Sequence, residues 1–187
     1  MLIRQIRFIR VLFLVLMDIR ETLIAEHSKE QTAKIVAYID GDPQKFAELM
    51  KLFLGPVYRI SQRAAWAVSN SIEQQPDLVK PYYGKLFEQL EREDSHIAVK
   101  RNVVRLLQFV KIPNRYVGRV FDVCYNLLDD PTEPVAVRCF SLSVAANIAK
   151  GQPELLDELR LVAKKYPQAA TAGFRSRARS VLGVLLK

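Results

Sequence analysis

Apolar residues recur every three or four positions along most of the chain, which is the pattern of amphipathic helices. The stretch from 127 to 151 shows it most clearly, with the apolar series Val137, Phe140, Val144 and Ile148. We expect Thr132 to cap this helix, Pro134 to lie in its first turn and Gly151 to end it. No stretch alternates strictly between apolar and polar residues, as a half-buried strand would. The pattern therefore predicts an all-α protein.

Helix-terminating residues divide the remaining chain in the same way. They predict four pairs of helices at about 43–54 with 57–74, 77–92 with 96–111, 114–129 with 133–150, and 152–166 with 171–187. Before these pairs, residues 18–40 have a helical pattern that is interrupted near 25–28. Ser28 followed by Gln31 fits a capping box, after which the expected apolar face consists of Ala33, Val36 and Ile39.

Two markers recur along these pairs with the same period. Prolines stand between successive pairs at spacings of 37 and 40 residues: Pro76, Pro113 and Pro153. Basic residues lie near the start of each second helix at spacings of 38, 37 and 39 residues: Arg63, Arg101, Arg138 and Arg177. A period of this length is typical of repeated helical pairs, in which each pair covers the apolar face of its neighbour.

The sequence Asp130-Pro131, followed by Val137-Arg138, resembles a HEAT repeat. Weaker copies are Asp94 with Val99-Lys100-Arg101, and the segment 63–68. The resemblance covers about 42–187 and implies an α-α superhelix, a right-handed solenoid of about four helical pairs with an N-terminal capping helix at 18–40. It implies a single domain at 17–187, with repeats at about 42–74, 75–111, 112–150 and 151–187. An armadillo-type unit, with an extra short helix, is the close structural alternative.

In such a stack the second helices share their apolar faces. We therefore predict one continuous seam that contains Ala65, Val68, Ile72, Val103, Leu106, Leu107, Val110, Phe140, Val144 and Ile148, extended by Leu182 and Leu185.

Residues 1–16 differ from the rest of the chain. Three arginines, Arg4, Arg7 and Arg10, precede an uninterrupted apolar run from Val11 to Met17. The run is too short to span a bilayer, and no small-residue cleavage site follows it. Three interpretations remain open: an upstream extension before a true start at Met17, a helix docked on the domain, or a targeting or membrane-contact segment.

Few residues indicate chemistry. Cys124 and Cys139 lie in apolar helical settings and are expected to be buried thiols in a reducing compartment. His27 and His96 are isolated, and acid pairs such as Asp129-Asp130 fall in turns. There is no glycine-rich phosphate loop, nucleophile elbow or zinc-binding helix motif. We therefore predict no catalytic residue, cofactor or metal site.

One class of enzyme is similar in fold and basicity, the HEAT-type DNA alkylpurine glycosylases. Those enzymes are longer and use aromatic residues grouped around an Asp in a cleft. This chain has one tryptophan, Trp66, which we expect to be packed in the core, and no Asp that we can match.

The net charge of +8 is unevenly distributed. The four predicted second helices contain twelve Lys and Arg against only Glu73 and Glu133, whereas the first helices are nearly balanced. In the HEAT architecture second helices usually line the concave side, so the resemblance implies a basic concave face. Its candidate partner-binding residues are Arg63, Lys100, Arg101, Arg105, Arg138, Arg175 and Arg179. A structural role competes with this assignment at Arg101 and Arg138, which in such stacks bond to carbonyl or acidic groups of an adjacent turn; Arg177 is another candidate for this role.

The sequence thus predicts a cytoplasmic, non-catalytic scaffold or adaptor that binds an acidic protein segment. The alternative function is binding of nucleic acid without sequence preference, through backbone contacts. No small-molecule substrate is evident, and a membrane partner is not expected.

Overall fold

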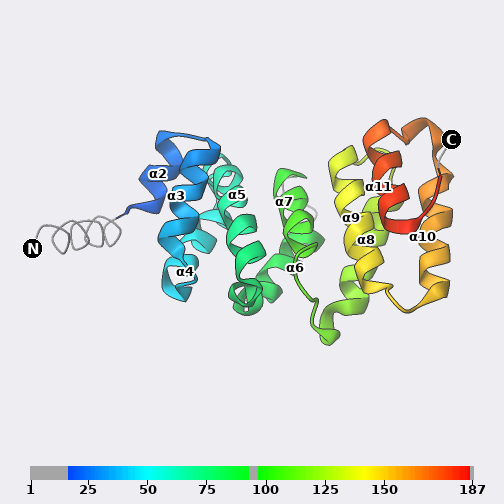
Figure 1. The fold of residues 1–187 in the computed structure, drawn as a ribbon, viewed down its shortest axis with the longest axis horizontal. Helices are drawn as coiled ribbons and strands as arrows, with labels where there is room; N and C mark the ends of the chain where they lie inside the picture. The colour runs from blue at the N-terminus through cyan, green and yellow to red at the C-terminus, as the bar shows by residue number, and fades with distance from the viewer. Residues whose placement is uncertain (1–16, 93–96, 186–187) are drawn as a thin grey trace, which may run out of the picture. The chain divides into compact units, whose positions relative to one another are not determined.

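The computed structural model describes residues 17–92 and 97–185, and every regular element within these ranges is helical (Figure 1). The all-α fold is therefore confirmed. Residues 1–16, with their three interpretations, and Asp94 lie outside the described residues. The chain forms two compact units that divide between Lys80 and Pro81, here called unit 1 and unit 2.

Unit 1 is built from two helical pairs. They are α2 (Ile19–Ala25) with α3 (Lys29–Ile39), and α4 (Pro43–Phe53) with α5 (Tyr58–Gln74). Helix α2 contacts α4, and α3 contacts α5, so the pairs stack in two layers. The α4 side chains at the centre of this stack are almost completely buried: Phe46, Leu49, Met50 and Phe53. The segment expected to be an N-terminal cap is thus a helical pair of its own.

The predicted capping box at the start of α3 forms only in part. The Gln31 backbone N–H donates to Ser28 Oγ at 3.1 Å, as expected. The Gln31 side chain, however, donates to the Thr22 carbonyl of α2, and so joins the two helices of the pair. The prediction of the apolar face was also wrong at Ala33, which is exposed. The buried face of α3 includes Ile35 together with the expected Val36 and Ile39.

Unit 2 contains three helical pairs. They are α6 (Tyr83–Glu91) with α7 (Ile97–Leu107), α8 (Val117–Asp129) with α9 (Val135–Ile148), and α10 (Pro153–Lys165) with α11 (Ala172–Leu182). Short 3₁₀ helices lie in the connections, at η1 (Pro76–Tyr82), η2 (Asn114–Tyr116) and η3 (Pro167–Ala169).

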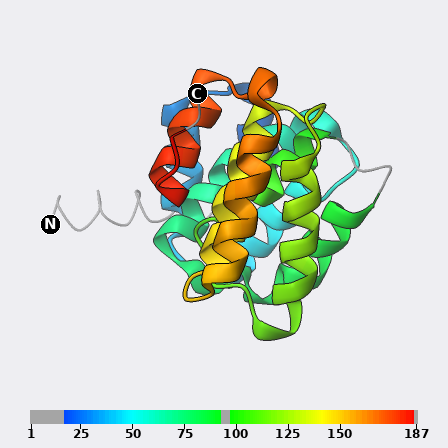
Figure 2. The same cartoon turned by 90° about the vertical axis from the view of Figure 1, so that its right-hand side faces the viewer.

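The pairs of unit 2 also stack in two layers. The first helices α6, α8 and α10 contact one another in this order, and the second helices α7, α9 and α11 do the same. Figure 2 shows α8 and α10 side by side, and Figure 1 shows α9 between α7 and α11. Helix α9 is consequently buried on several faces, as its apolar composition requires: Val137, Leu142, Val144 and Ala145 are at most 1% exposed.

Several predicted helix ends were wrong. Helix α7 ends at Leu107 and not near 111, and the helix expected at 77–92 begins as the 3₁₀ helix η1. Thr132 does not cap α9, where Pro134 occupies the N-cap position. Instead the Thr132 backbone N–H and hydroxyl both donate to Asp130 Oδ1, which closes the turn after α8.

Most of the predicted seam residues are buried, and four of them are not. Val110, Phe140 and Ile148 are half-buried. Leu185 is 72% exposed, because Gly183 with φ of 66° ends α11 before the chain reaches it. The continuity of the seam between the two units stays a prediction.

Candidate interaction surface

Arg138, one of the basic repeat markers, is only 1% exposed. Its Nε donates to the Leu128 carbonyl at the end of α8, at 3.1 Å, and its Nη1 to the Ala169 carbonyl of η3, at 3.3 Å. The guanidinium carbon lies 4.6 Å from the centre of the Phe174 ring on α11. Arg138 therefore joins the second and third pairs of unit 2.

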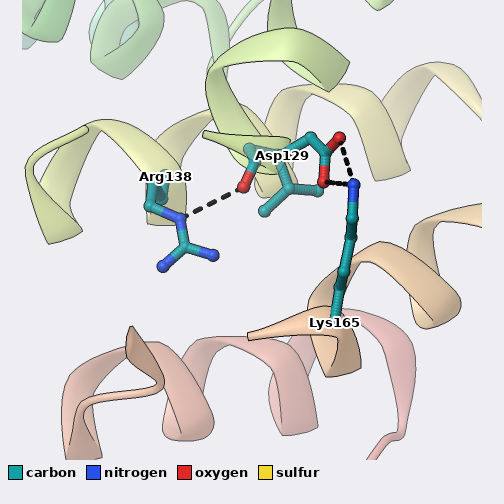
Figure 3. A network of polar contacts seen from close by, with 4 residues as sticks. Asp129, Arg138 and Lys165 are labelled. Atoms are coloured by element: carbon teal, nitrogen blue, oxygen red, sulfur yellow. Dashed lines mark hydrogen bonds and ion pairs between the residues drawn. The ribbon is translucent and has the colours of Figure 1, made fainter. Parts of the chain in front are cut away.

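Nearby carboxylates offset part of the cost of burying the Arg138 charge. Burial lowers the pKa of the guanidinium, while Asp129 and Asp130 act in the opposite direction. Next to Leu128, the Asp129 carboxylate accepts hydrogen bonds from Lys165 Nζ at 2.7 and 2.8 Å (Figure 3). Two cations thus meet the C-terminal end of α8, where unpaired carbonyls and the helix dipole favour positive charge. The assignment of Arg138 to a partner-binding surface was wrong, because the side chain is not accessible.

Arg63 has the equivalent role in unit 1. Its Nη1 donates to the carbonyls of Leu23 and Ile24 at the end of α2, at 2.7 and 2.8 Å. The structural interpretation of the basic marker is thus confirmed at Arg138 and also describes Arg63. Arg101 is half-buried, and its side chain makes no hydrogen bond to a residue that the structure describes.

The remaining candidates lie on two second helices of unit 2. Lys100, Arg101 and Arg105 are on α7 and half-buried. On α11, Arg179 is exposed, whereas Arg175 is half-buried and donates to the Ala170 carbonyl just before its own helix. Because α9 contacts both α7 and α11, these two basic helices flank the same central helix.

The second helices of unit 2 contain no acidic residue. Their seven charged side chains are all Lys or Arg: Lys100, Arg101, Arg105, Arg138, Arg175, Arg177 and Arg179. Among described residues, none of the seven takes part in an ion pair. Glu133, just before α9, is one carboxylate within electrostatic reach of Lys100; burial is the main cause of its raised pKa.

By contrast, the ion pairs between described residues of unit 2 lie on the first helices. Arg119 of α8 pairs with Glu91 of α6, and the hydrogen bond from Arg119 lowers the pKa of the Glu91 carboxyl. Lys165 of α10 pairs with Asp129 of α8. Sequence reasoning placed Asp129 in a turn and missed these pairs, because their partners are 28 and 36 residues apart.

The aromatic residues pack against one another. Tyr83 stacks on Phe87, whose ring centre is 4.6 Å from that of Tyr116. In unit 1 the half-buried Trp66 meets His27 edge-on, with ring centres 6.0 Å apart. These contacts explain the aromatic positions by packing.

The His, Cys, Asp and Glu side chains of the described part of the chain are scattered. There, no three His, Cys, Asp or Glu side chains are grouped so that they could hold a metal ion. Cys124 and Cys139 are both free and buried, and burial raises the pKa of each thiol, that of Cys124 to about 12. None of the described helices has the length and apolar character needed to cross a membrane.

Comparison with known proteins identifies a family. A family model for the HEAT repeat domain matches residues 19–184, which is nearly all of the described chain. No curated protein and no solved structure matches it. The family match agrees with the stacked helical pairs, in which the basic markers Arg63 and Arg138 donate to carbonyls of neighbouring helical segments. The chain belongs to the HEAT repeat family.

Proposed function

We propose that unit 2 binds an acidic protein segment through the basic residues of α7 and α11, and that the protein is a non-catalytic scaffold. HEAT repeats generally serve as helical scaffolds for protein interactions. The observation that carries the proposal is the separation of charge in unit 2. The ion pairs between described residues of unit 2 involve cations of the first helices, whereas the charged residues of the second helices are all basic. The two buried free thiols support the further proposal of a reducing, cytoplasmic setting.

Such a distribution favours an anionic partner for a physical reason. Neighbouring cations without carboxylates raise the local positive potential, and an acidic segment relieves their mutual repulsion. The structural roles of Arg63 and Arg138 reduce the candidate set. We assign partner contacts to Lys100, Arg101 and Arg105 on α7, and to Arg175 and Arg179 on α11.

The proposal can be tested with a polyglutamate peptide as the probe. We expect binding at low salt that weakens as salt is added, and a further loss in the double variant Arg105→Ala, Arg179→Ala. The matched control is Lys85→Ala, Lys164→Ala, which removes two exposed lysines from the first helices α6 and α10. The control should bind like the unmodified protein. Equal weakening in both double variants, or no binding at low salt, would contradict the proposal.

Nucleic acid is the competing partner, and the same proteins should be titrated with a mixed-sequence duplex and a single strand. If about five phosphates are contacted, log K falls with log salt concentration at a slope of about −4 to −5. Each arginine removed from α7 or α11 should then reduce the slope by about one. Tighter binding to nucleic acid than to polyglutamate of equal charge would identify nucleic acid, and not an acidic protein segment, as the partner.

A further inference from the structure

A pocket of about 460 Å³ lies in unit 2 where α7 and α9 end and α8 begins. This volume is within the range of pockets that hold a ligand or an anchoring side chain. Its walls come from three parts of the chain: the end of α7 with the loop after it, η2 with the first residue of α8, and the C-terminal part of α9 with Lys150 after it. We call it the α7–α9 pocket.

The pocket exists because α7 stops early. The apolar pattern continues to Val110, but the helix ends at Leu107. The backbone N–H groups of Gln108 and Phe109 then donate to the Arg105 and Leu106 carbonyls, three residues earlier, in tighter turns than those of an α-helix. The apolar side chains that follow are therefore incompletely covered. Phe109 is 39% exposed, and three half-buried residues line the pocket: Val110, Val117 and Ile148.

The charged residues that line the pocket are both basic. Lys111 and Lys150 are exposed, and no Asp or Glu is among the lining residues. Each lysine follows the end of a helix, where positive charge is favourable in itself. The same positions nevertheless leave two ammonium groups beside an apolar wall. The other polar lining residues are neutral amides, of which Asn147 donates to the Gln108 carbonyl at 3.4 Å.

The pocket of unit 1 has a different electrostatic character. It measures about 520 Å³, and its lining includes Asp18 and Glu48 as well as Arg20 and Lys51. Carboxylates and cations balance there, so charge selects neither an acidic nor a basic partner. The combination of uncovered apolar side chains with positive charge alone distinguishes the α7–α9 pocket.

We propose that the α7–α9 pocket receives one large apolar side chain of the acidic segment, with carboxylates on either side of that residue next to Lys111 and Lys150. The inference rests on the proposed function and adds an anchor to it. A row of cations by itself attracts any polyanion, whereas an apolar pocket that must be filled requires a particular residue in the partner. The pocket would therefore supply the specificity that the basic helices lack.

Selection from a random-peptide library displayed on phage tests the inference, because the protein itself then chooses the peptides that it binds. With the unmodified full chain as bait, we expect peptides in which Asp or Glu residues flank a Leu, Ile, Met or Phe at a fixed position. The same selection on Lys111→Ala, Lys150→Ala should lose the acidic flanks of that position.

A selected peptide then allows measurement of individual contributions. Changing the central apolar residue of the peptide to alanine should lower its affinity about tenfold or more, because a buried aromatic or aliphatic anchor dominates such contacts. Phe109→Ala in the protein should have a similar effect. The matched control is Leu161→Ala, which removes an apolar side chain that is 70% exposed on α10. Lys85→Ala, Lys164→Ala is the control for the two lysines, and circular dichroism verifies that all variants are folded.

The outcomes separate the anchor from the proposed function. Selected peptides that are acidic but show no fixed apolar position would overturn the anchor and leave the basic surface in place. An apolar position without acidic flanks would overturn the carboxylate contacts at Lys111 and Lys150. Selected peptides without either feature would contradict both proposals.

Discussion

At the scale of single residues, Arg138 joins three neighbouring elements of unit 2 through its side chain. It lies on α9 and contacts the last turn of α8, the 3₁₀ helix η3 and the Phe174 ring of α11. A guanidinium suits this position because it is planar, donates in several directions and stacks on an aromatic ring. Lysine offers the charge without the fork or the flat face. The marker residue of the repeat thus determines how neighbouring helices are held together.

We predict that Arg138→Met lowers the free energy of unfolding by about 2–4 kcal/mol, because the buried Leu128 carbonyl and the partly buried Ala169 carbonyl lose a charged donor. Urea denaturation followed by circular dichroism measures the loss. The matched control is Arg179→Met on exposed α11 surface, which should change stability by less than about 0.5 kcal/mol. Equal small effects in both variants would show that the Arg138 contacts contribute nothing to the fold.

Cys124 is the second residue for which burial has a measurable consequence. Burial raises the pKa of its thiol from 9.0 to about 12, so the native protein keeps the proton at a pH where the unfolded chain loses it. Below pH 9 the thiol is neutral in both states. As pH rises from 9 towards 12, ionisation favours the unfolded chain, and stability decreases.

Between roughly pH 8 and roughly pH 10, we therefore expect the unmodified protein to lose about 1 kcal/mol of stability relative to Cys124→Ala. Urea denaturation at the two pH values measures it, and Cys139 is present in both proteins, so its contribution cancels. Native Cys124 should also resist alkylation and react after denaturation. Rapid alkylation of the native thiol would show that Cys124 is accessible.

At the scale of elements, the turn between α3 and α4 depends on backbone geometry. Asp40 and Gly41 have φ values of 41° and 74°, in the left-handed region, and Asp42 then caps α4 through hydrogen bonds from the Gln44 and Lys45 backbone N–H groups. A side chain at Gly41 would also approach the Gln75 amide to 2.1 Å. The glycine therefore lets one helical pair follow another after only a short link.

Gly41→Ala should lower the free energy of unfolding by about 1–2 kcal/mol, because an L-residue is strained in this conformation. Gly118→Ala is the matched substitution in the exposed first turn of α8, where φ is not positive and a Cβ meets nothing within 4 Å. There the same change should raise stability by up to about 1 kcal/mol. Thermal and urea denaturation of both variants would show opposite signs. A loss of stability in both would indicate that Gly118 has a packing role.

At the scale of the whole molecule, each unit is a stack in which one pair completes the core of the next. In unit 2 this dependence is centred on α9, which contacts α7, α8, α10 and α11. Leu106 of α7 has no exposed surface and belongs to this shared core. Damage at one repeat is therefore expected to spread to its neighbours.

We predict that Leu106→Ala costs about 2–5 kcal/mol in the free energy of unfolding. Hydrogen exchange should show lower protection in α7 and in the adjacent α9. The control Leu161→Ala, on a residue 70% exposed, should change stability by less than about 0.5 kcal/mol. Loss of protection limited to α7 would show that the repeats of unit 2 unfold independently.

Much of this architecture follows from local signals. The spacing of apolar residues, the Asp42-Pro43 cap and the recurrence of Pro and Arg at spacings of 37 to 40 residues predict the helical pairs and their family. The apolar spacing and the cap act within one or two turns of chain, and the recurrence is a pattern of residue types, so sequence alone expresses all three. The sequence also determined the separation of charge, because Lys and Arg fall on the second helices whatever their contacts are.

Tertiary structure decided which of those basic residues are accessible. Arg138 and Arg105 look alike in the sequence, yet one is buried among carbonyls and an aromatic ring that lie 10, 31 and 36 positions away, and the other stays half-buried. Tertiary structure also decided the end of α7 at Leu107, since the apolar pattern continues past it. Both outcomes depend on contacts between distant segments, which contribute as much free energy as local preferences and leave no local signature in the chain.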